Sequence, residues 1–591
     1  MKEDQEVTLW KKSNLVRSSQ LQHRALLAPY LVYAQRYCSS RGLAAMWQAP
    51  AIAALVTISA PAVSQATDPG LSNFFQEWRA VAAPETSSGT PDFTAPALAR
   101  KRVLLTRMRA KFKALDRSQW APAAHIDARL VEAEMNGLDF DLRVLRPWAR
   151  DPGFYANVWA EMSDVPEHEG STAPPIDLFR FTFPLSKADA AVLSQQLAAI
   201  PRLLDQARVN LRDGNARDLW RYSDQVLSAQ VETLARLEAG TLRLRTLEGE
   251  PVASLAGTGP ELRHAVRAAR KASEAFRLWV ADEARTKSGP SGIGKTEYDW
   301  YARNVHLVPY SWEEQRTLLQ RELDRAIAGL RLEELHNRNL PQLPMLQDPA
   351  AYHAWSRQRL QRFGDFLISA RLMEERPAYR SALEARLIAY RAPVDRDFFG
   401  HGTALDPMPL YSHFYHWVEL ARMREQPHPD PIRRALPLSN IYDGRAEGFA
   451  TALEELAMQA GLYDDVPRGR EIVYIMLANR AARGLASLHV QANAWDLAQA
   501  GRFHARWTPR GWSDANSALV RFEQLLYLRQ PGYGTSYVIG KLQFDHLVAR
   551  LSERADRDGT RLDMRDVFAR FLDAGVIPVA LIEAEMLGEA N

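Results

Sequence analysis

The chain has 591 residues, of which 46% are hydrophobic and 25% charged, as in an ordinary soluble globular protein. Its 74 Lys and Arg residues nearly balance 71 Asp and Glu residues, and no long basic block contains interleaved aromatic side chains, so nucleic acid is not a favoured partner. The length exceeds that of a single hydrophobic core and predicts two lobes.

An export signal is predicted well after the first residue. Residues 1–45 are polar and basic, and residues 46–66 form an apolar run rich in small residues, which is typical of a signal peptide and too short for a membrane span. We expect cleavage before Thr67, export to the periplasm or secretion, and no stable membrane span afterwards. The alternative is an internal hydrophobic segment of a cytosolic protein. The only cysteine, Cys38, precedes the cut, so a mature chain would have neither disulfides nor thiolate ligands.

The rest of the sequence reads as one amphipathic helix after another, separated by short loops rich in Pro, Gly and Ser. Strand-like alternation is scarce, which predicts a mainly α, multi-helical fold with at most a small β-sheet, near residues 393–409. Helices are predicted, in chain order, over residues 97–115, 125–145, 187–211, 219–239, 260–286, 312–335, 410–424, 444–461, 468–501, 513–528, 535–554 and 564–575.

Residues 391–408 interrupt the helical periodicity and give the best position for a boundary between lobes. We therefore predict an N-terminal extension and signal peptide over residues 1–66, a helical lobe over residues 67–391 and a second helical lobe over residues 392–591. Ligand sites favour domain interfaces, so chemistry is expected in a central cleft between the lobes.

Residues 289–296 match the Walker A pattern of phosphate-binding loops. Such a loop needs a buried strand before it and a helix after it. The preceding residues have the charge and the period of a helix instead. We interpret the match as a Gly-rich turn between helices, with P-loop nucleotide binding as a distant alternative.

A closely spaced histidine pair, His413 and His416, is predicted to share one helix face and to offer imidazole nitrogens to one zinc ion. Glu419 follows in the same helix as a candidate general base. The alternative is that both histidines are packing residues among neighbouring aromatic side chains. The usual zincin signature, with two histidines four residues apart and a glutamate after the first, is absent from the sequence.

Two glutamates on the next predicted helix, Glu447 and Glu454, lie seven residues apart and therefore on the same side, among small and apolar residues. Because an unpaired buried charge is costly, carboxylates in such a place indicate a role, and one of them would complete a metal site with three ligands. The alternative is ion pairing with arginines such as Arg445, Arg480 or Arg483.

A Gly-rich turn at residues 529–541 leads into a helix and presents Tyr533 and Tyr537. A tyrosine hydroxyl on such an element can donate a hydrogen bond to a developing oxyanion, and Tyr537 is the candidate for that catalytic role. Ordinary turn and packing roles are the alternative.

Seven blocks of the sequence resemble, in the same order, the bacterial domain of unknown function 885 (DUF885) family. The blocks are residues 146–155, 163–171, 291–301, 447–463, 480–500, 529–541 and 571–583. The resemblance spans nearly all of the expected mature chain. It implies that residues 292–298 form a recurring Gly-Lys-Tyr turn.

The resemblance also implies a two-lobed helical fold related to zinc metallopeptidases of the thermolysin-like superfamily. Typical members carry a His-Glu pair shortly before Pro-Gly-His, which supply metal ligands and the general base, and a later Glu-Gly-Trp-Ala block. Here residues 447–450 match the later block with Phe449 for Trp, and His416 aligns with the histidine of Pro-Gly-His. The departures are Leu410 and Tyr411 opposite His-Glu, Phe414 and Tyr415 opposite Pro-Gly, and Ser487 and Gln491 opposite a later Asp and His.

These observations predict an exported, metallopeptidase-like protein that hydrolyses peptide bonds in small peptides with zinc as cofactor. The predicted metal ligands are His413, His416, Glu447 and Glu454, and the predicted catalytic residues are Glu419 and Tyr537. The alternative is an inactive family member that binds a peptide or a partner protein, because the departures fall on residues that the chemistry needs.

Overall fold

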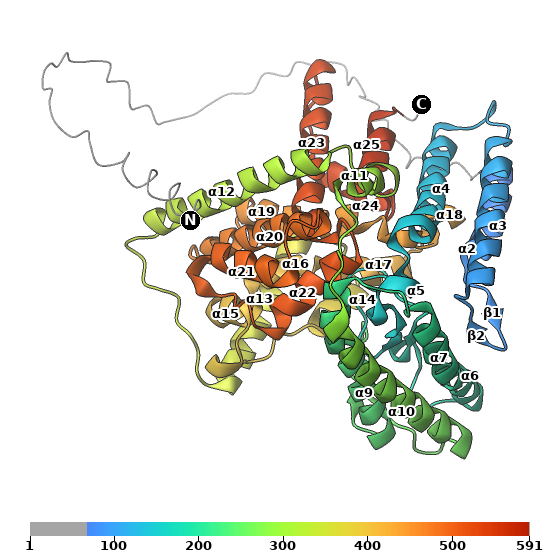
Figure 1. Ribbon diagram of the computed structural model, residues 1–591. Helices are drawn as coiled ribbons and strands as arrows, with labels where there is room; N and C mark the ends of the chain where they lie inside the picture. Colours follow the sequence, from blue (N-terminus) through green and yellow to red (C-terminus); the bar gives the residue numbers. More distant parts are fainter. Residues whose placement is uncertain (1–67, 590–591) are drawn as a thin grey trace, which may run out of the picture. The chain divides into compact units, whose positions relative to one another are not determined.

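Long amphipathic helices make up most of the computed structural model, which describes residues 68–589 (Figure 1). Before residue 391 the helices are α2 (Pro69–Ala82), α3 (Ala95–Lys113), α4 (Pro122–Phe140), α5 (Pro147–Arg150), α6 (Lys187–Ala198), α7 (Ile200–Asn210), α8 (Arg217–Tyr222), α9 (Asp224–Ala239), α10 (Pro260–Glu283), α11 (Lys295–Asn304), α12 (Trp312–His336), α13 (Pro349–Ser369) and α14 (Pro377–Glu384). The predicted signal segment and Cys38 lie outside the described residues.

After residue 391 the helices are α15 (Phe398–Leu405), α16 (Met408–His413), α17 (Tyr415–Glu425), α18 (Pro431–Arg434), α19 (Asp443–Gln459), α20 (Gly469–Gln491), α21 (Leu497–Trp507), α22 (Ala518–Arg529), α23 (Tyr533–Arg557), α24 (Met564–Asp573) and α25 (Val579–Leu587). Short turns of 3-10 or π helix are η1 (Asp141–Leu145), η2 (Pro152–Tyr155), η3 (Leu178–Arg180), η4 (Ala284–Thr286), η5 (Pro393–Asp395), η6 (Leu438–Asn440) and η7 (Pro509–Gly511).

Strands are few and short in the described part of the chain. They form three pairs: β1 (Thr86–Ser87) with β2 (Thr90–Pro91), β3 (Val158–Trp159) with β4 (Ile176–Asp177), and β5 (Leu242–Arg243) with β6 (Val252–Ala253). The β3–β4 pair is parallel, with Val158 opposite Ile176, and the other two pairs are antiparallel. The predicted mainly α fold is thus confirmed.

The small sheet predicted near residues 393–409 is wrong. Turn η5 and helix α15 occupy that segment. The side chain of Asp397 accepts a hydrogen bond from the backbone N–H of Gly400 at 2.8 Å, which caps the first turn of α15. Pro393 and Pro407 lie on either side of this short helix, and Gly400 and Gly402 lie within it.

Four predicted helices are each divided in the structure, those over residues 187–211, 219–239, 410–424 and 468–501. The helix expected over residues 410–424 breaks at Phe414, where ψ is 6°. The helix expected over residues 468–501 ends at Gln491, because Asn493 adopts a left-handed backbone with φ of 58°. Asp496 and Gln499 then form a capping box that begins α21.

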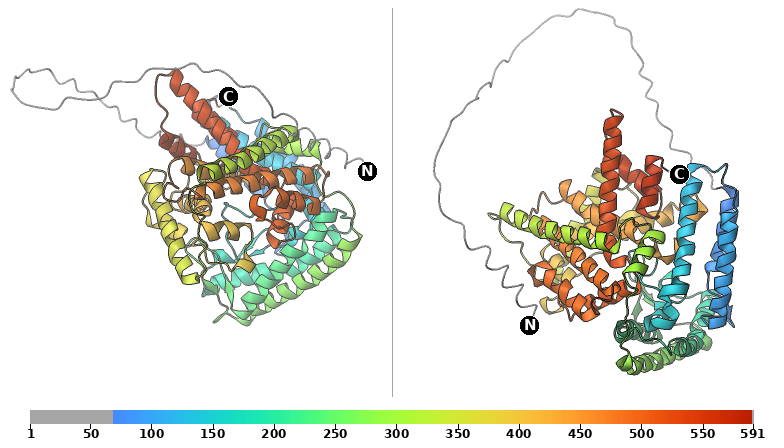
Figure 2. Two further views of the ribbon diagram at one scale, coloured as in Figure 1. Left: turned by 90° about the vertical axis from the view of Figure 1, so that its left-hand side faces the viewer. Right: turned by 45° about the horizontal axis from the view of Figure 1, so that its top comes forward.

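The core is built from pairs of long helices. Helix α12 lies along α20, α19 packs against α23, and α10 packs against α9, as Figures 1 and 2 show. Contacts place the described residues, 68–589, in one compact unit. The division at residue 391 and the central cleft stay predictions. Among residues 68–589 no helix combines the length and the apolar character that a membrane span requires.

Candidate functional site

The two histidines of the sequence pair meet at a junction of two helices. His413 is the last residue of α16, and His416 lies in the first turn of α17. Their rings are 4.8 Å apart at an interplanar angle of 85°, and both side chains are buried. Because the helix breaks at Phe414, the two histidines do not share one helix face as predicted. Their imidazole rings are nevertheless adjacent.

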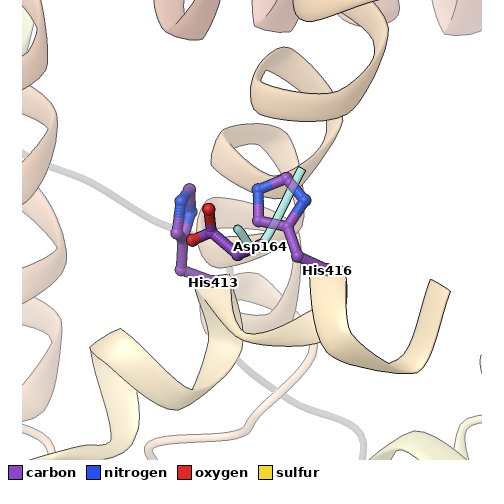
Figure 3. A group of neighbouring side chains, drawn as sticks. All are labelled: Asp164, His413 and His416. Carbon is purple, nitrogen blue, oxygen red and sulfur yellow. The ribbon is translucent and has the colours of Figure 1, made fainter. Parts of the chain in front are cut away.

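A carboxylate from a distant part of the chain joins the histidines. Asp164 lies in the loop between β3 and β4 and is half-buried. One donor atom each from Asp164, His413 and His416 lie within 4.8 Å of one another. Figure 3 shows the Asp164 carboxylate between the two imidazole rings. Two imidazoles and a carboxylate are a common donor set for zinc.

Glu447 of α19 stands beside both histidines. Its Oε2 atom is 3.5 Å from His413 Nε2 and 3.4 Å from His416 Nε2. The Glu447 Oε2 and His416 Nε2 atoms are buried and have no hydrogen-bond partner among the described residues. Buried polar atoms are nearly always satisfied, so an unsatisfied pair at one place calls for an explanation.

The spacing of these atoms fits a shared metal ion better than a hydrogen bond. Hydrogen bonds between nitrogen and oxygen are most often about 2.9 Å long. Two ligand atoms that bind one tetrahedral zinc are about 3.3 Å apart, since each bond is about 2.0–2.1 Å long. The His413–Glu447 and His416–Glu447 separations are close to that ligand spacing.

A tyrosine links Glu447 to a second loop carboxylate. The Tyr533 hydroxyl, at the start of α23, contacts Glu447 Oε1 at 2.6 Å and also Glu169 Oε1. Donor atoms of Asp164, Glu169 and Glu447 form a second group within 4.8 Å. Burial and the charge of Asp164 raise the pKa of Glu169 to about 8. Burial alone would raise the pKa of Glu447 too, but the two imidazoles hold it well below its usual range.

Glu454, predicted as a metal ligand, is engaged elsewhere. Its carboxylate receives two hydrogen bonds of 2.6 Å from the Arg480 guanidinium, and both side chains are buried. Its Oε1 atom is also 2.9 Å from His413 Nδ1, on the ring edge away from Glu447. This is the arginine pairing that was the alternative for this residue, and both partners border His413, since Arg480 Nη2 lies 3.2 Å from His413 Nδ1.

Glu419, the predicted general base, is likewise paired. Arg445 contacts both of its oxygens, at 2.5 Å and 3.2 Å, and the Arg445 side chain is fully buried. Burial would raise the pKa of Glu419, but the guanidinium outweighs burial and lowers it. An ion-paired carboxylate of lowered pKa is a weak proton acceptor.

Tyr537, the predicted oxyanion donor, borders the histidine side of the site. Its ring stacks on that of His413 with centroids 6.3 Å apart, and the Arg483 guanidinium lies 4.3 Å from its ring centre. Its hydroxyl is 3.5 Å from the Tyr533 hydroxyl. The structure therefore places both predicted tyrosines next to the histidine and glutamate cluster.

Comparison with known proteins identifies the family. Residues 79–339 and 416–586 match the family described as "Bacterial protein of unknown function (DUF885)". The chain belongs to this family. His413 lies between the two matched segments, whereas His416 and Glu447 lie within the second. No curated protein matches the chain.

Two solved structures share the DUF885-family fold seen here. A proposed lipoprotein of unknown function from Shewanella oneidensis has a TM-score of 0.58 and 12% sequence identity, covering 88% of this chain and 99% of its own. A proposed lipoprotein from Colwellia psychrerythraea has a TM-score of 0.58 and 11% identity, covering 88% and 97%. At this identity the likeness concerns the fold, and the relation to zinc metallopeptidases stays a prediction.

Sequence reasoning missed two residues of this DUF885-family site, Asp164 and Glu169. Both lie in residues 163–171, a block already noticed for its resemblance to the family. Three acidic residues and one histidine within six positions were the available signal. It was weak because about 250 positions separate this loop from the histidine pair, and only tertiary contacts join them.

The Walker-like loop is a turn between helices. Helix α10 and turn η4 precede it, and α11 begins at Lys295. The N–H of Gly292 donates to Asn493 Oδ1 and the N–H of Gly294 donates to the carbonyl of Gln491, both at 2.8 Å. Lys295 pairs with Glu313 at 2.6 Å. Groups that would hold phosphate are thus already bonded within the protein.

Proposed function

We propose that this chain is an exported, metal-dependent hydrolase that cleaves peptide bonds in small peptides. In this proposal Asp164, His413 and His416 hold a zinc ion, with Glu447 beside them as a further ligand. The observation that carries the proposal is the convergence of unsatisfied buried atoms, His416 Nε2 and Glu447 Oε2, next to a third donor from Asp164.

The donor chemistry supports zinc as the metal. Imidazole nitrogen and carboxylate oxygen are ligands of catalytic zinc, which can expand from four to five ligands, so that water can bind beside the protein residues. A bound zinc ion would supply a water molecule that ionises near neutral pH and would polarise a carbonyl group. Neighbouring residues support the ligands, because Glu454 contacts the other ring nitrogen of His413 at 2.9 Å.

The remaining side chains are assigned by their positions. Glu169, like Asp164, is a half-buried carboxylate of the cluster, and we assign Glu169 to accept a proton from the attacking water. Tyr533 orients Glu169 and Glu447 through its hydroxyl. Tyr537 is assigned to donate a hydrogen bond to the developing oxyanion. Glu419 is assigned to the Arg445 ion pair that supports α17 and α19.

Export is part of the proposal and rests on two observations. Residues 46–66 have the composition of a signal peptide. The two structures of the same fold are proposed lipoproteins, a class of exported proteins. N-terminal sequencing of the protein secreted or released from its native host tests this assignment, with a start at Thr67 as the expected result.

Metal content and peptide hydrolysis test the site. We expect about one zinc ion per chain by plasma mass spectrometry, and loss of zinc in His416→Ala and Asp164→Ala. Hydrolysis of a mixture of short peptides should fall by about 100-fold or more in both variants, since the activated water is lost with the metal. His264→Ala, which removes an exposed histidine of α10, should retain zinc and activity.

The outcomes separate the proposal from its main alternative. Folded protein that binds zinc and short peptides without cleaving them would favour a binding protein of this family. Folded protein that takes up no zinc, with peptide hydrolysis unchanged in His416→Ala, would contradict the metal site itself.

A further inference from the structure

A cavity of about 500 Å³ is lined by residues of the loop that also supplies Asp164 and Glu169. Loop residues Glu167 and His168 line it, together with Asp141 at the start of η1. The same short loop therefore contributes alternately to the metal-ligand cluster and to the cavity wall. Gln530 and Pro531, which also line the cavity, lead directly into α23 and Tyr533.

The two arginines of the cavity are each neutralised by a carboxylate of the protein. Arg79 donates to Glu134 Oε1 at 2.6 Å and to Glu134 Oε2 at 3.1 Å. Arg529 donates to Asp151 Oδ2 at 2.7 Å and also to the Ser171 carbonyl. Neither guanidinium is left to attract an anionic ligand.

Two carboxylates of the cavity have no such partner. Within residues 68–589 neither the Asp141 nor the Glu167 side chain makes a hydrogen bond or an ion pair, although nearby Arg180 and Arg79 partly offset the effect of burial on the pKa of Glu167. Burial, with no positive charge to offset it, raises the pKa of Asp141 to about 7. The cavity thus has an excess of negative charge that a bound cation would balance.

His168 adds an unsatisfied polar atom to the same wall. Its side chain is 7% exposed, its Nε2 is 2.6 Å from Asp177 Oδ1, and its Nδ1 has no partner in the described structure. Because the Asp177 carboxylate only accepts, the neutral imidazole carries its proton on Nε2. The Nδ1 atom is then a buried acceptor, available for an N–H group of a ligand.

Two residues beside the cavity have a strained backbone, and one of them holds the cavity wall in place through its side chain. Ser439 and Asn440 are consecutive non-glycine residues in the left-handed region, with φ of 58° and 50°. The Asn440 side chain donates to the carbonyl of His168 and to Gln530 Oε1, both at 2.9 Å. These bonds connect the loop of the cluster with the segment that begins α23.

We propose that this cavity is a subsite that binds a cationic nitrogen of the substrate, an alkylammonium or guanidinium group. Asp141 and Glu167 supply the charge, and His168 Nδ1 accepts a hydrogen bond from the bound N–H. The assignment of the bound group to a substrate rests on the proposed hydrolase function. The cation has two sources in a peptide, the free α-amino terminus and the side chain of a basic residue.

Calorimetric titration of the full-length protein with small probes tests the subsite without requiring cleavage. The probes are alaninamide, with only an α-amino group, Nα-acetyl-lysine amide, with only a side-chain amine, and Nα-acetyl-alanine amide, which is neutral. At pH 8 we expect at least one cationic probe to bind about tenfold or more tightly than the neutral probe. The tighter of the two cationic probes identifies the source of the cation.

Matched variants assign the binding to the cavity. Asp141→Asn with Glu167→Gln should abolish the preference for cationic probes. Asp205→Asn with Glu132→Gln makes the same change of charge at exposed positions of α7 and α4 and should keep the preference. Equal binding of cationic and neutral probes, or a preference that survives Asp141→Asn with Glu167→Gln in folded protein, would overturn the proposal.

The test separates this subsite from the metal site. His416→Ala should lose zinc while its preference for the cationic probe persists, because the cavity does not include that histidine. A cavity that binds cations in a protein without hydrolytic activity would support the subsite and contradict the hydrolase. If hydrolysis is observed and the probes bind equally, the hydrolase stands and the subsite fails.

Discussion

Three buried glutamates near the histidine pair differ in what surrounds them. Arg445 binds Glu419 and Arg480 binds Glu454, so both carboxylates are held in buried ion pairs. Glu447 faces two imidazoles and a tyrosine hydroxyl instead. A guanidinium in contact satisfies a carboxylate fully, whereas a neutral imidazole leaves it able to bind a cation. The arginines thus decide which glutamate remains available as a metal ligand.

The unpaired carboxylate of Asp141 should make stability depend on pH. Its folded pKa of about 7 lies above its ordinary value of 3.8, so its stabilising contribution is present below about pH 4 and is lost as the pH rises through 7. We expect Asp141→Asn to be more stable than the natural chain at pH 8 by on the order of 2 kcal/mol, discounted because the side chain borders an open cavity. Denaturant unfolding between pH 4 and pH 8 measures the difference.

The control for this prediction is Asp205→Asn, at an exposed position of α7. It should leave the pH dependence of unfolding unchanged. A gap between Asp141→Asn and the natural chain that is constant from pH 4 to pH 8 would argue against the raised pKa.

At the scale of elements, the site depends on a close crossing of α19 and α23. A Cβ atom on Gly448 would lie 2.4 Å from the backbone carbon of Gly540, and one on Gly540 would lie 2.0 Å from the carbonyl oxygen of Gly444. Both helices carry cluster residues, Glu447 on α19 and Tyr533 on α23. The absence of side chains at the crossing brings Glu447 and Tyr533 within hydrogen-bonding distance.

Alanine substitutions at two glycines of the same helix test this crossing. Gly448→Ala should destabilise the protein by about 3 kcal/mol or more and should weaken zinc binding, because backbone rather than a flexible side chain blocks the added methyl group. Gly444→Ala should be tolerated, since its Cβ meets only Gln543 Oε1 at 3.7 Å and alanine favours helix by about 1 kcal/mol. Thermal unfolding and zinc content measure both effects. Equal effects of the two substitutions would contradict this account.

The helices themselves were largely predictable from periodicity, whereas their ends were not. Helix α12 agrees closely with the predicted range because Ser311 and Glu314 form a capping box that can be read in the sequence. The break at Phe414 has no such local signal, since the aromatic and apolar residues around it continue a helical pattern. Packing of the two short helices, not propensity, decides where the chain turns.

At the scale of the molecule, buried ion pairs join the segments before and after residue 391. Asp127 of α4 binds Arg433 of α18 at 2.7 Å, and Asp151 binds Arg529 of α22 at 2.7 Å. All four side chains are buried. Each of these buried carboxylates before residue 391 is therefore neutralised by an arginine that follows it. Asp164, which precedes residue 391, also lies beside His413 and His416, which follow it.

Removal of one such arginine should lower the stability of the whole described unit. Arg433→Ala leaves Asp127 buried without its cation, a change that typically costs about 3–5 kcal/mol. We expect a single calorimetric transition that moves to lower temperature as a unit. Arg565→Ala removes an arginine from the exposed pair with Asp563 and should change little. Two separate transitions, only one of which moves, would support independent lobes divided at residue 391.

The sequence by itself determined the helical class, most helix positions and the DUF885 resemblance. Each of these follows from local periodicity or from short blocks of residues. Only the tertiary structure decided that Asp164 and Glu169 join the cluster and that Arg445 and Arg480 withdraw Glu419 and Glu454 from it. The physical reason is that charge pairing and metal-ligand spacing act over a few ångströms in space, between residues that can be hundreds of positions apart in the chain.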